Sequence, residues 1–295
     1  MARRWNLSDV KILNKEGLEF LSDIPDNSID LILTDPPYIT SRKSGMDKWV
    51  DHVARQDSSG SINIMTEDSW NKYKTKEQWD DWFSNGKVPE EKRDKKLQEL
   101  KNNYLKYGSI YGKKYAVKTD YGKWDSEFTM EKLQLFISHF HRVLKDGGTC
   151  IIFFDLWKIS YLKEQLENVK FKQIRFIEWI KTNPQPVNSS VNYLTNCREI
   201  ALLGIKKSKP TFNSKYDKGI YEYPIYGGKD RFHPTQKSLP LFEDLIKKHS
   251  NEGDIILDCF LGSGTTALAA RKTGRKFIGC ELDQNFFKKT LDRMK

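Results

Sequence analysis

A strand, a glycine loop, a helix and a second strand follow one another near the end of the chain, and this unit limits the possible folds most. The loop CFLGSG separates the apolar run DIILD from a helical pattern that closes at Gly274, and the run RKFIGCE follows. Gly262, Gly264 and Ala267 fit the spacing G-x-G-x-x-A, and Glu281 comes 19 positions after Gly262. In parallel α/β sheets this arrangement indicates a bound adenosine moiety, with the acid on its ribose. The motif alone is also compatible with tight packing of a helix on a strand.

The position of this unit predicts a rearranged sheet. Only 14 residues follow Glu281, whereas a dinucleotide-binding domain begins with such a loop and then continues through further strands. The missing strands must come from earlier in the chain, where apolar runs at 29–34, 149–155, 171–180 and 199–205 are separated by helical or polar segments. We therefore expect an α/β fold with a doubly wound, mostly parallel sheet, circularly permuted so that the ligand-binding half comes last.

The run LILTDPPY ends a predicted buried strand in an acid, two prolines and an aromatic ring. Two prolines remove two backbone donors, which ends pairing but holds the turn still. If the ligand is S-adenosylmethionine, Asp35 can accept one hydrogen of an exocyclic amine and the Pro36 carbonyl can accept another. Tyr38 offers a stacking face for a base that has been flipped out of a duplex. The alternative is a strand-terminating turn with an exposed acid.

Composition narrows the partner and the compartment. A net charge of +10 and a pI near 9.2 suit a polyanionic partner. The four cysteines are scattered without a CxxC pair, which argues against a zinc site or a disulfide framework and favours a cytoplasmic location. We expect no bound metal. No apolar run approaches the length of about 18 residues that a membrane span needs, and the first residues lack the apolar core of a signal peptide.

Two polar segments interrupt the alternation, and their length suggests function or disorder. We expect residues 1–38 and 122–295 to form the catalytic domain and 39–121 to form a large insertion that contacts DNA and contributes to target recognition. Residues 71–118 hold 13 Lys and Arg against 7 Asp and Glu, and 89–107 read as an exposed helix. Residues 206–231 are expected to form a short second recognition loop, although either segment could be a solvated surface loop.

Six marks in a fixed order resemble the β group of amino-directed DNA methyltransferases, in which the catalytic motif precedes the cofactor motif. The resemblance covers roughly 10–38, 124–205 and 231–295. Its marks are DNSIDLILTDPPY, RVLKDGG, IEWIKTNPQP, RFHPTQKSLPLFEDLI, DIILDCFLGSGTT and RKFIGCELD. It implies a sheet of the S-adenosylmethionine-dependent methyltransferase type, S-adenosylmethionine as the methyl donor, DNA as the partner and base flipping.

The resemblance also implies roles for individual residues. The turn that follows the predicted strand at 29–34 is expected to form the catalytic pocket. The glycine loop is expected to line the cofactor, and Glu281 to bind its ribose. Asp258 is expected near the methionine amino group, and Thr235 and Lys237 near its carboxylate, unless this segment only caps a helix. Glu16 stands where the family usually has an aspartate that approaches the adenine, and Cys259 stands where proline is common. The implied residues are Asp35, Pro36, Pro37 and Tyr38 in the catalytic pocket, and Glu16, Thr235, Lys237, Asp258, Phe260, Leu261, Gly262, Ser263, Gly264, Thr265 and Glu281 around the cofactor.

Several functions remain open at this stage. Within the family an aspartate at the first motif position favours the N6 amine of adenine, and a serine favours the N4 amine of cytosine. Methylation of carbon 5 of cytosine is disfavoured, because it usually needs a Pro-Cys turn and none exists here. Alternatives are an RNA or protein-amide methyltransferase, a dinucleotide-dependent oxidoreductase and a non-catalytic nucleic-acid module. A restriction endonuclease of the same restriction-modification system and a homodimer are further possible partners.

Overall fold

The structure is a computed structural model that describes residues 9–38, 63, 65–73, 76–85, 88–111, 128–184, 196–228, 231–233 and 235–295. Contacts along the chain divide it into two compact units. The first, here called the sheet unit, comprises Met1–Ile39 and Tyr121–Lys295, and the second, the helical unit, comprises Thr40–Asp120.

The sheet unit contains a mostly parallel sheet in the order β1-β8-β7-β2-β3-β5-β4-β6. Every neighbouring pair is parallel except those made by β5, which runs antiparallel to β3 and to β4. The predicted doubly wound α/β fold is therefore confirmed. The strands are β1 (Val10–Asn14), β2 (Ile29–Thr34), β3 (Leu144–Phe154), β4 (Phe171–Lys181), β5 (Arg198–Lys206), β6 (Ile220–Tyr223), β7 (Ile255–Asp258) and β8 (Lys276–Glu281).

The predicted permutation is also confirmed, because the last two strands of the chain lie between the first two. β8 pairs with β1, and β7 pairs with β2 in the register Leu31↔Ile256 and Ile32↔Leu257. Parallel neighbours end at the same edge of a sheet. The turn after β2 and the glycine loop after β7 therefore leave the sheet side by side, although more than two hundred positions separate them in the chain.

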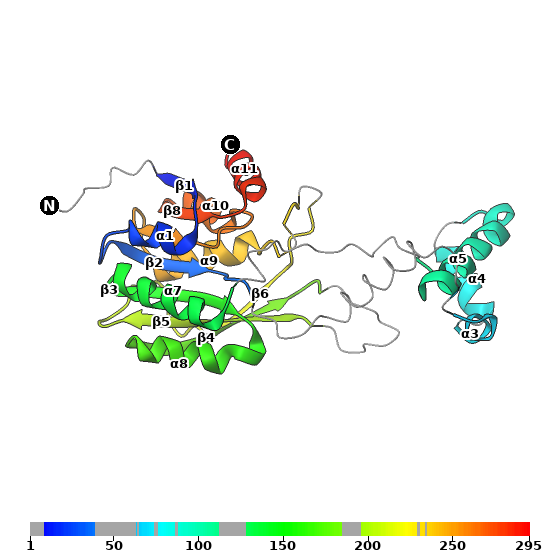
Figure 1. The fold of residues 1–295 in the computed structure, drawn as a ribbon, viewed down its shortest axis with the longest axis horizontal. Coiled ribbons are helices and arrows are strands. Elements are labelled where there is room, and N and C mark those ends of the chain that lie inside the picture. The colour runs from blue at the N-terminus through cyan, green and yellow to red at the C-terminus, as the bar shows by residue number, and fades with distance from the viewer. Residues whose placement is uncertain are drawn as a thin grey trace. The chain divides into compact units, whose positions relative to one another are not determined.

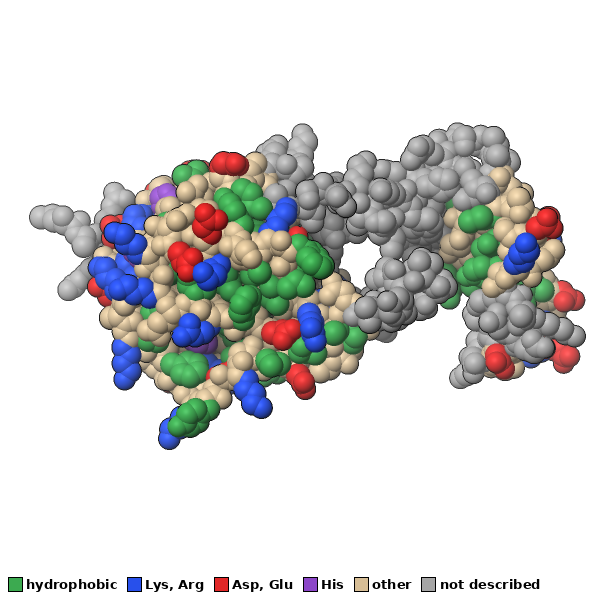
Figure 2. Space-filling model, turned by 90° about the horizontal axis from the view of Figure 1, so that it is seen from below, with side chains coloured by type: hydrophobic (Ala, Val, Ile, Leu, Met, Phe, Trp, Pro, Cys, Tyr) green, Lys and Arg blue, Asp and Glu red, His purple; other side chains and the backbone are tan. Residues whose placement is uncertain are grey.

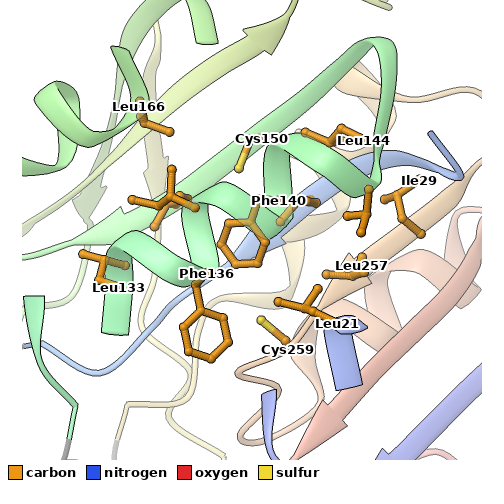
Figure 3. Packing of buried hydrophobic residues seen from close by; sticks show 14 of the residues in the cluster. Leu21, Ile29, Leu133, Phe136, Phe140, Leu144, Cys150, Leu166, Leu257 and Cys259 are labelled. Atoms are coloured by element: carbon orange, nitrogen blue, oxygen red, sulfur yellow. The ribbon is translucent and has the colours of Figure 1, made fainter. Parts of the chain in front are cut away.

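Helices cover both faces of this sheet (Figure 1). Side chains from α1, α7 and α8 form one core with the sheet, and side chains from α9 and α10 form the other. Figure 3 shows Phe136 and Phe140 of α7 turned toward Leu21 of α1 and toward Leu257 and Cys259 at the end of β7. The helices are α1 (Gly17–Ser22), α7 (Met130–Val143), η2 (Leu156–Lys158), α8 (Ile159–Asn168), α9 (Leu239–His249), α10 (Thr265–Lys272) and α11 (Gln284–Arg293).

Two boundaries differ from the sequence-based expectation. β3 begins at Leu144, directly after α7, and a register shift between Ile29 and Leu31 lets it pair with β2 on both sides of the glycines. Residues 206–231 contain β6, which pairs in parallel with the edge of β4. Its four residues alternate between exposed and buried too briefly for the pattern to stand out in the sequence. This segment is therefore partly built into the sheet.

The helical unit has an aromatic core of its own. The core contains Trp70, Trp79, Phe83, Leu100 and Tyr104, together with Leu105 and Ile110. The helix expected to be exposed is instead packed against its neighbours, because Leu100, Tyr104, Leu105 and Tyr107 are all buried. In the sequence, Leu97, Leu100 and Tyr104 mark the apolar stripe of this helix, and its buried face in the structure is wider. The elements are α3 (Glu67–Tyr73), α4 (Lys76–Asn85), η1 (Glu90–Lys92) and α5 (Arg93–Tyr107).

The surface mixes charges of both signs with exposed apolar side chains. Figure 2 shows lysine, arginine, aspartate and glutamate side chains interspersed on one face, with hydrophobic side chains between them. The most exposed apolar residues include Trp157, Tyr216 and Phe176. Within the described part of the chain, no helix has the length and apolar character that crossing a membrane requires.

Candidate active site

The turn Asp35-Pro36-Pro37-Tyr38 follows β2 directly, at the edge where β2, β3 and β7 end. β2 is central in the sheet, and Leu31, Ile32, Leu33 and Thr34 are fully buried on it. Pairing stops at the turn because neither proline can donate to a neighbouring strand. The buried strand thus delivers the Asp35 carboxylate to the carboxyl edge of the sheet, where ligands of such folds bind.

The Asp35 carboxylate is held by a lysine on one side only. Lys237 Nζ lies 2.9 Å from Asp35 Oδ2, and the Asp35 side chain is 18% exposed. Asp35 Oδ1 is buried and has no hydrogen-bond partner among the described residues. Burial raises the pKa of Asp35 to about 6, with Lys237 opposing the rise and the acid Glu199 adding to it. Lys237 therefore fixes one carboxylate oxygen, and the other has no partner in hydrogen-bond geometry among the described residues, although the nearby Tyr38 hydroxyl lowers the pKa of Asp35 slightly.

Tyr38 stands beside this carboxylate with its ring held edge-on against Phe154. The two ring centroids lie 6.1 Å apart at an interplanar angle of 69°. The ammonium of Lys237 lies 5.6 Å from the Tyr38 ring centroid. Tyr38 Oη is buried without a partner among the described residues, and burial together with Asp35 raises the pKa of the phenol well above its usual value. The phenol stays neutral and can serve as a donor or an acceptor.

The glycine loop after β7 takes the conformation that its sequence predicts. Gly262 has φ 53° and Gly264 has φ 76°, a region that disfavours residues with a Cβ. A Cβ on Gly264 would lie 2.5 Å from Thr290 Cγ2 of α11, and one on Gly262 would lie 3.3 Å from Nε2 of His233. The backbone therefore passes close to both neighbours. Gly264 also provides the N-cap of α10.

Glu281 reaches back from the end of β8 to this loop. Its Oε2 accepts a hydrogen bond from Gly262 N at 2.7 Å, and its Oε1 accepts one from Asp283 N at 2.8 Å. The residue is 8% exposed, and burial raises the pKa of its carboxyl to about 7 despite these two donors. Each carboxylate oxygen retains a lone pair, so Glu281 can still accept hydrogen bonds from a ligand at the loop.

Asp258 forms hydrogen bonds both with the end of β2 and with the segment around the glycine loop. Its Oδ1 accepts hydrogen bonds from Thr34 Oγ1 at 2.6 Å and Phe260 N at 3.0 Å, and its Oδ2 accepts one from Thr266 Oγ1 at 2.6 Å. Thr34 directly precedes Asp35, so this buried carboxylate links the end of β2 to the glycine loop. Burial raises the pKa of Asp258. Its three partners make it primarily an organiser of the loop.

The remaining loop residues lie at the same edge. Phe260 packs on Phe136 at a centroid distance of 4.6 Å, and Leu261 is buried on the other face. Ser263 Oγ and Thr265 Oγ1 lie 3.1 Å apart. These contacts fix the loop between both cores.

Two other residues that were predicted to bind the cofactor, Glu16 and Thr235, contact protein groups in the structure. Glu16 caps α1 by accepting from Leu18 N and Glu19 N, while its second oxygen pairs with Lys132. It follows β1, which ends beside Glu281, and so lies at the same sheet edge. Thr235 is exposed and contacts Nδ1 of His233 at 3.1 Å.

Lys237 is placed against the catalytic turn. Besides its 2.9 Å contact with Asp35, Lys237 Nζ lies 2.5 Å from Glu199 Oε2, and Glu199 in turn pairs with Lys181 at 2.7 Å. The resemblance implies a place beside the methionine carboxylate, whereas in the structure two of the three ammonium hydrogens face protein carboxylates. Lys237 and Asp35 are brought together, although 202 positions separate them.

Sequence reasoning missed Glu199, Lys181 and Thr34. The one available signal was Glu199, an acid next to the start of the otherwise apolar run IALLGI. Its partners could not be read from the pattern, because they come from other strands. Among the described residues no group of three or more histidine, cysteine or acidic side chains lies together in a way that could hold a metal ion.

Comparisons with known proteins place this geometry in context. Residues 109–292 match the family model described as DNA methylase, of the N6 and N4 type. The chain is 34% identical over 192 residues to Type II methyltransferase M2.DpnII of Streptococcus pneumoniae, an alignment that covers 59% of this chain and 71% of that protein.

Solved structures share the fold. The M1.HpyAVI–SAM complex has a TM-score of 0.57 at 24% identity, covering 96% of this chain and 99% of that one. PvuII DNA methyltransferase, described as cytosine-N4-specific, has a TM-score of 0.62 at 15% identity, covering 98% of this chain and 87% of that one.

Proposed function

Since this chain belongs to the DNA methylase family of N6- and N4-directed enzymes, we propose that it methylates the exocyclic N6 amine of adenine in DNA, with S-adenosylmethionine as methyl donor. The observation that carries the proposal is the Asp35 carboxylate. It is buried at the carboxyl edge of the sheet, held by Lys237 through one oxygen and unsatisfied at the other. An unsatisfied buried acceptor at this edge suits an amine hydrogen.

The residues around the glycine loop fit the methyl donor. Gly262 and Gly264 give the loop the positive φ angles of its turn, and Glu281 offers acceptor capacity at the loop for ribose hydroxyls. In their ionised forms, Asp258 and Glu281 add negative charge beside a site for a cationic sulfonium. When bound, S-adenosylmethionine supplies an electrophilic methyl group and leaves as a neutral thioether once the amine nitrogen has taken that methyl. Glu16, Phe260, Leu261, Ser263, Thr265 and Thr235 complete the proposed lining.

The catalytic turn positions the amine and receives its proton. Asp35 Oδ1 accepts one amine hydrogen and the Pro36 carbonyl accepts the other, which leaves the nitrogen lone pair free of conjugation with the ring. Tyr38 stacks on the base, which must leave the duplex to reach this buried turn. After methyl transfer the nitrogen carries one proton too many. Asp35, with a pKa of about 6, can take that proton and release it to water.

Adenine is proposed over cytosine because the first position of the turn is an aspartate, as the family preference for N6 chemistry implies. N4-cytosine methylation is the second candidate, since the family includes both activities and the fold is shared with a cytosine-N4-specific enzyme. Incubation with plasmid DNA and labelled S-adenosylmethionine, followed by enzymatic digestion and mass spectrometry, distinguishes the two. We expect N6-methyladenine. N4-methylcytosine alone would reject the adenine assignment, and no labelled nucleoside would reject DNA methylation.

The helical unit is proposed to supply much of the DNA contact. It is inserted directly after the catalytic turn and has its own packed core. Its basic excess is concentrated toward its C-terminal end, where residues 101–118 hold five lysines and no acid. Residues 39–62 and 112–127 lie outside the described part of the chain. Residues 206–231 are proposed as a second contact. A paired restriction endonuclease, a homodimer and a cytoplasmic location complete the proposal.

A further inference from the structure

Four charged side chains form an alternating chain behind the catalytic turn. Lys237 Nζ lies 2.9 Å from Asp35 Oδ2 and 2.5 Å from Glu199 Oε2, and Lys181 Nζ lies 2.7 Å from Glu199 Oε1. Their side chains are between 8% and 19% exposed. Solvent therefore screens this chain poorly, and each charge affects its neighbours strongly.

These four charged side chains come from separate segments of the protein. Asp35 follows β2, and Lys181 ends β4. Glu199 lies at the start of β5, which runs antiparallel to β3 and so begins where β3 ends. Lys237 precedes α9. Since each residue occupies the same edge of the sheet through a different element, the fold itself brings the chain of charges to the catalytic turn.

Lys237 is confined between the two carboxylates. Its ammonium lies 5.6 Å from the Tyr38 ring centroid and 5.4 Å from that of Phe153. Although burial disfavours its charge, Asp35 and Glu199 raise the pKa of Lys237 well above its usual value. The lysine remains a cation, and two acids share it.

Sharing the cation changes what Asp35 can do. A carboxylate that faced Lys237 alone would bear the full attraction of the ammonium and would be a weaker acceptor. Glu199 takes part of that attraction, and its own negative charge raises the pKa of Asp35, in addition to the larger effect of burial. Lys181 and Lys237 in turn lower the pKa of Glu199 against its burial, so Glu199 stays ionised.

We infer that Glu199, braced by Lys181, is a positioning residue of the methyl-transfer site. It holds Lys237 between two carboxylates, so that Asp35 is oriented through Oδ2 and keeps an electron-rich Oδ1 for the target amine. The inference rests on the proposed function. It concerns the orientation of Asp35 and its strength as a hydrogen-bond acceptor. If the ion pairs had only a structural role, they would simply join β4, β5 and the segment before α9.

The test uses two variants with opposite expected effects. Glu199→Gln removes the competing acid, so the pKa of Asp35 should fall by about half a pH unit or more. Lys237→Met removes the cation, so the pKa of Asp35 should rise. The titration is followed in the free full-length protein by the carboxyl ¹³C resonance of Asp35, assigned by its loss in Asp35→Asn. The Tyr38 phenol, the other titratable group that acts on Asp35, stays unchanged in both variants.

Kinetics supply the second readout. In single-turnover methyl transfer, the acidic limb of the pH profile should move down in Glu199→Gln and up in Lys237→Met. The plateau rate of Glu199→Gln should fall about tenfold, less than the roughly 100- to 10,000-fold of a complete acid–base contribution, because Asp35 itself remains. Its dissociation constant for S-adenosylmethionine should stay within about twofold. Glu199→Asp, which draws the carboxylate back, should give a smaller change in the same direction.

Glu178→Gln is the matched control. Glu178 lies on β4 and pairs with the exposed Arg198 at 3.3 Å, outside the chain of charges. It should leave the Asp35 titration and the rate unchanged. Shifts in the same direction for Glu199→Gln and Lys237→Met, or an unchanged Asp35 titration in folded Glu199→Gln or Glu199→Asp, would overturn the inference. Opposite shifts without any methyl transfer to DNA would instead reject the proposed function and leave the charge arrangement standing.

Discussion

At the residue scale, the asymmetry of Asp35 is the central feature of the site. A buried carboxylate normally satisfies both oxygens, because an unpaired buried acceptor costs about 1–3 kcal/mol. Asp35 satisfies one oxygen with Lys237 and leaves the other without a partner among the described residues. An unsatisfied buried group in a folded protein requires an explanation, and a catalytic role is one such explanation. This supports Asp35 as the group that meets the substrate.

We predict that Asp35→Asn lowers the single-turnover methyl-transfer rate by about 100-fold or more. The variant keeps the size of the side chain but removes the charge of a preorganised acceptor. Calorimetry should show that affinity for S-adenosylmethionine changes little. Asp155→Asn is a suitable control, because Asp155 directly follows the neighbouring strand β3 and its side chain caps η2 by accepting a hydrogen bond from Trp157 N at 2.9 Å. Equal losses in both variants would contradict the role of Asp35.

We also predict that affinity for S-adenosylmethionine increases as pH rises through about 7. Burial raises the pKa of Glu281 from 4.5 to about 7, so the free protein holds its proton there until that pH. Ribose hydroxyl donors favour the ionised carboxylate, and binding therefore releases a proton. Calorimetry between pH 5.5 and 8.5 should show the rise, and Glu281→Gln should abolish it. An equally steep rise in Glu281→Gln would assign the effect to another group.

The raised pKa of Glu281 also makes the stability of the protein depend on pH. The folded-state pKa of Glu281 lies above its unfolded value, so its contribution to the free energy of unfolding is complete below pH 4.5. It is lost as pH rises through about 7. His233 acts in the opposite sense, because burial, together with Lys237 and Arg231, lowers its pKa to about 4. Its contribution is present above pH 6.5 and is lost as pH falls through about 4. The two effects therefore oppose each other in the free protein.

At the element scale, the glycine loop depends on positive φ angles and on close contact with α11. Gly264 has φ 76°, and an added Cβ would lie 2.5 Å from Thr290 Cγ2. Thr290 also donates through Oγ1 to the Gly262 carbonyl at 2.8 Å, so the last helix supports the loop that would receive the cofactor. The final ten-residue helix thus contributes to the site without supplying a ligand group.

We predict that Gly264→Ala destabilises the protein more than Gly253→Ala does. Both glycines have positive φ, but a Cβ on Gly253, with φ 83°, would meet nothing within 4 Å. Gly253→Ala should cost only the conformational strain of about 1–2 kcal/mol, while Gly264→Ala adds a steric clash. Urea unfolding of both variants gives the comparison. Equal losses would mean that α11 shifts freely and does not support the loop.

At the scale of the whole molecule, the chain combines a sheet unit that holds the proposed chemistry with a helical unit that has its own core. The ring centroids of Trp70 and Trp79 lie 5.3 Å apart within that core, which α3, α4 and α5 form. The ion pair between Lys101 and Glu67, at 2.7 Å, joins α5 to α3. An insertion with this much internal packing is suited to present a fixed surface to DNA.

We predict that replacing residues 57–115 by a short Gly-Ser linker removes most DNA affinity and site selectivity but leaves S-adenosylmethionine affinity intact. The proposed cofactor residues all belong to the sheet unit. DNA binding is measured by fluorescence anisotropy at two salt concentrations, since phosphate contacts weaken as salt rises. Retained DNA affinity with unchanged selectivity would show that recognition resides elsewhere, for instance in residues 206–231.

Local patterns in the sequence determined the elements and the two motifs at their ends. The run IDLILT became β2 without a change of boundary, and the turn and the glycine loop follow β2 and β7 as the sequence predicts. Their convergence was predicted as well, and it follows from the parallel pairing of β2 with β7. These features depend on periodicity and on proline and glycine geometry, which can be read in one dimension.

Only the tertiary structure decided which charges meet at the catalytic turn. It placed Lys237 between Asp35 and Glu199, joined Asp258 to Thr34, and packed the helix expected to be exposed into an aromatic core. Each of these contacts joins segments whose distance in the chain carries no signal of their proximity. Which side chains share a buried space depends on strand order, register and packing. In a weakly screened interior, that placement then determines how each group is charged.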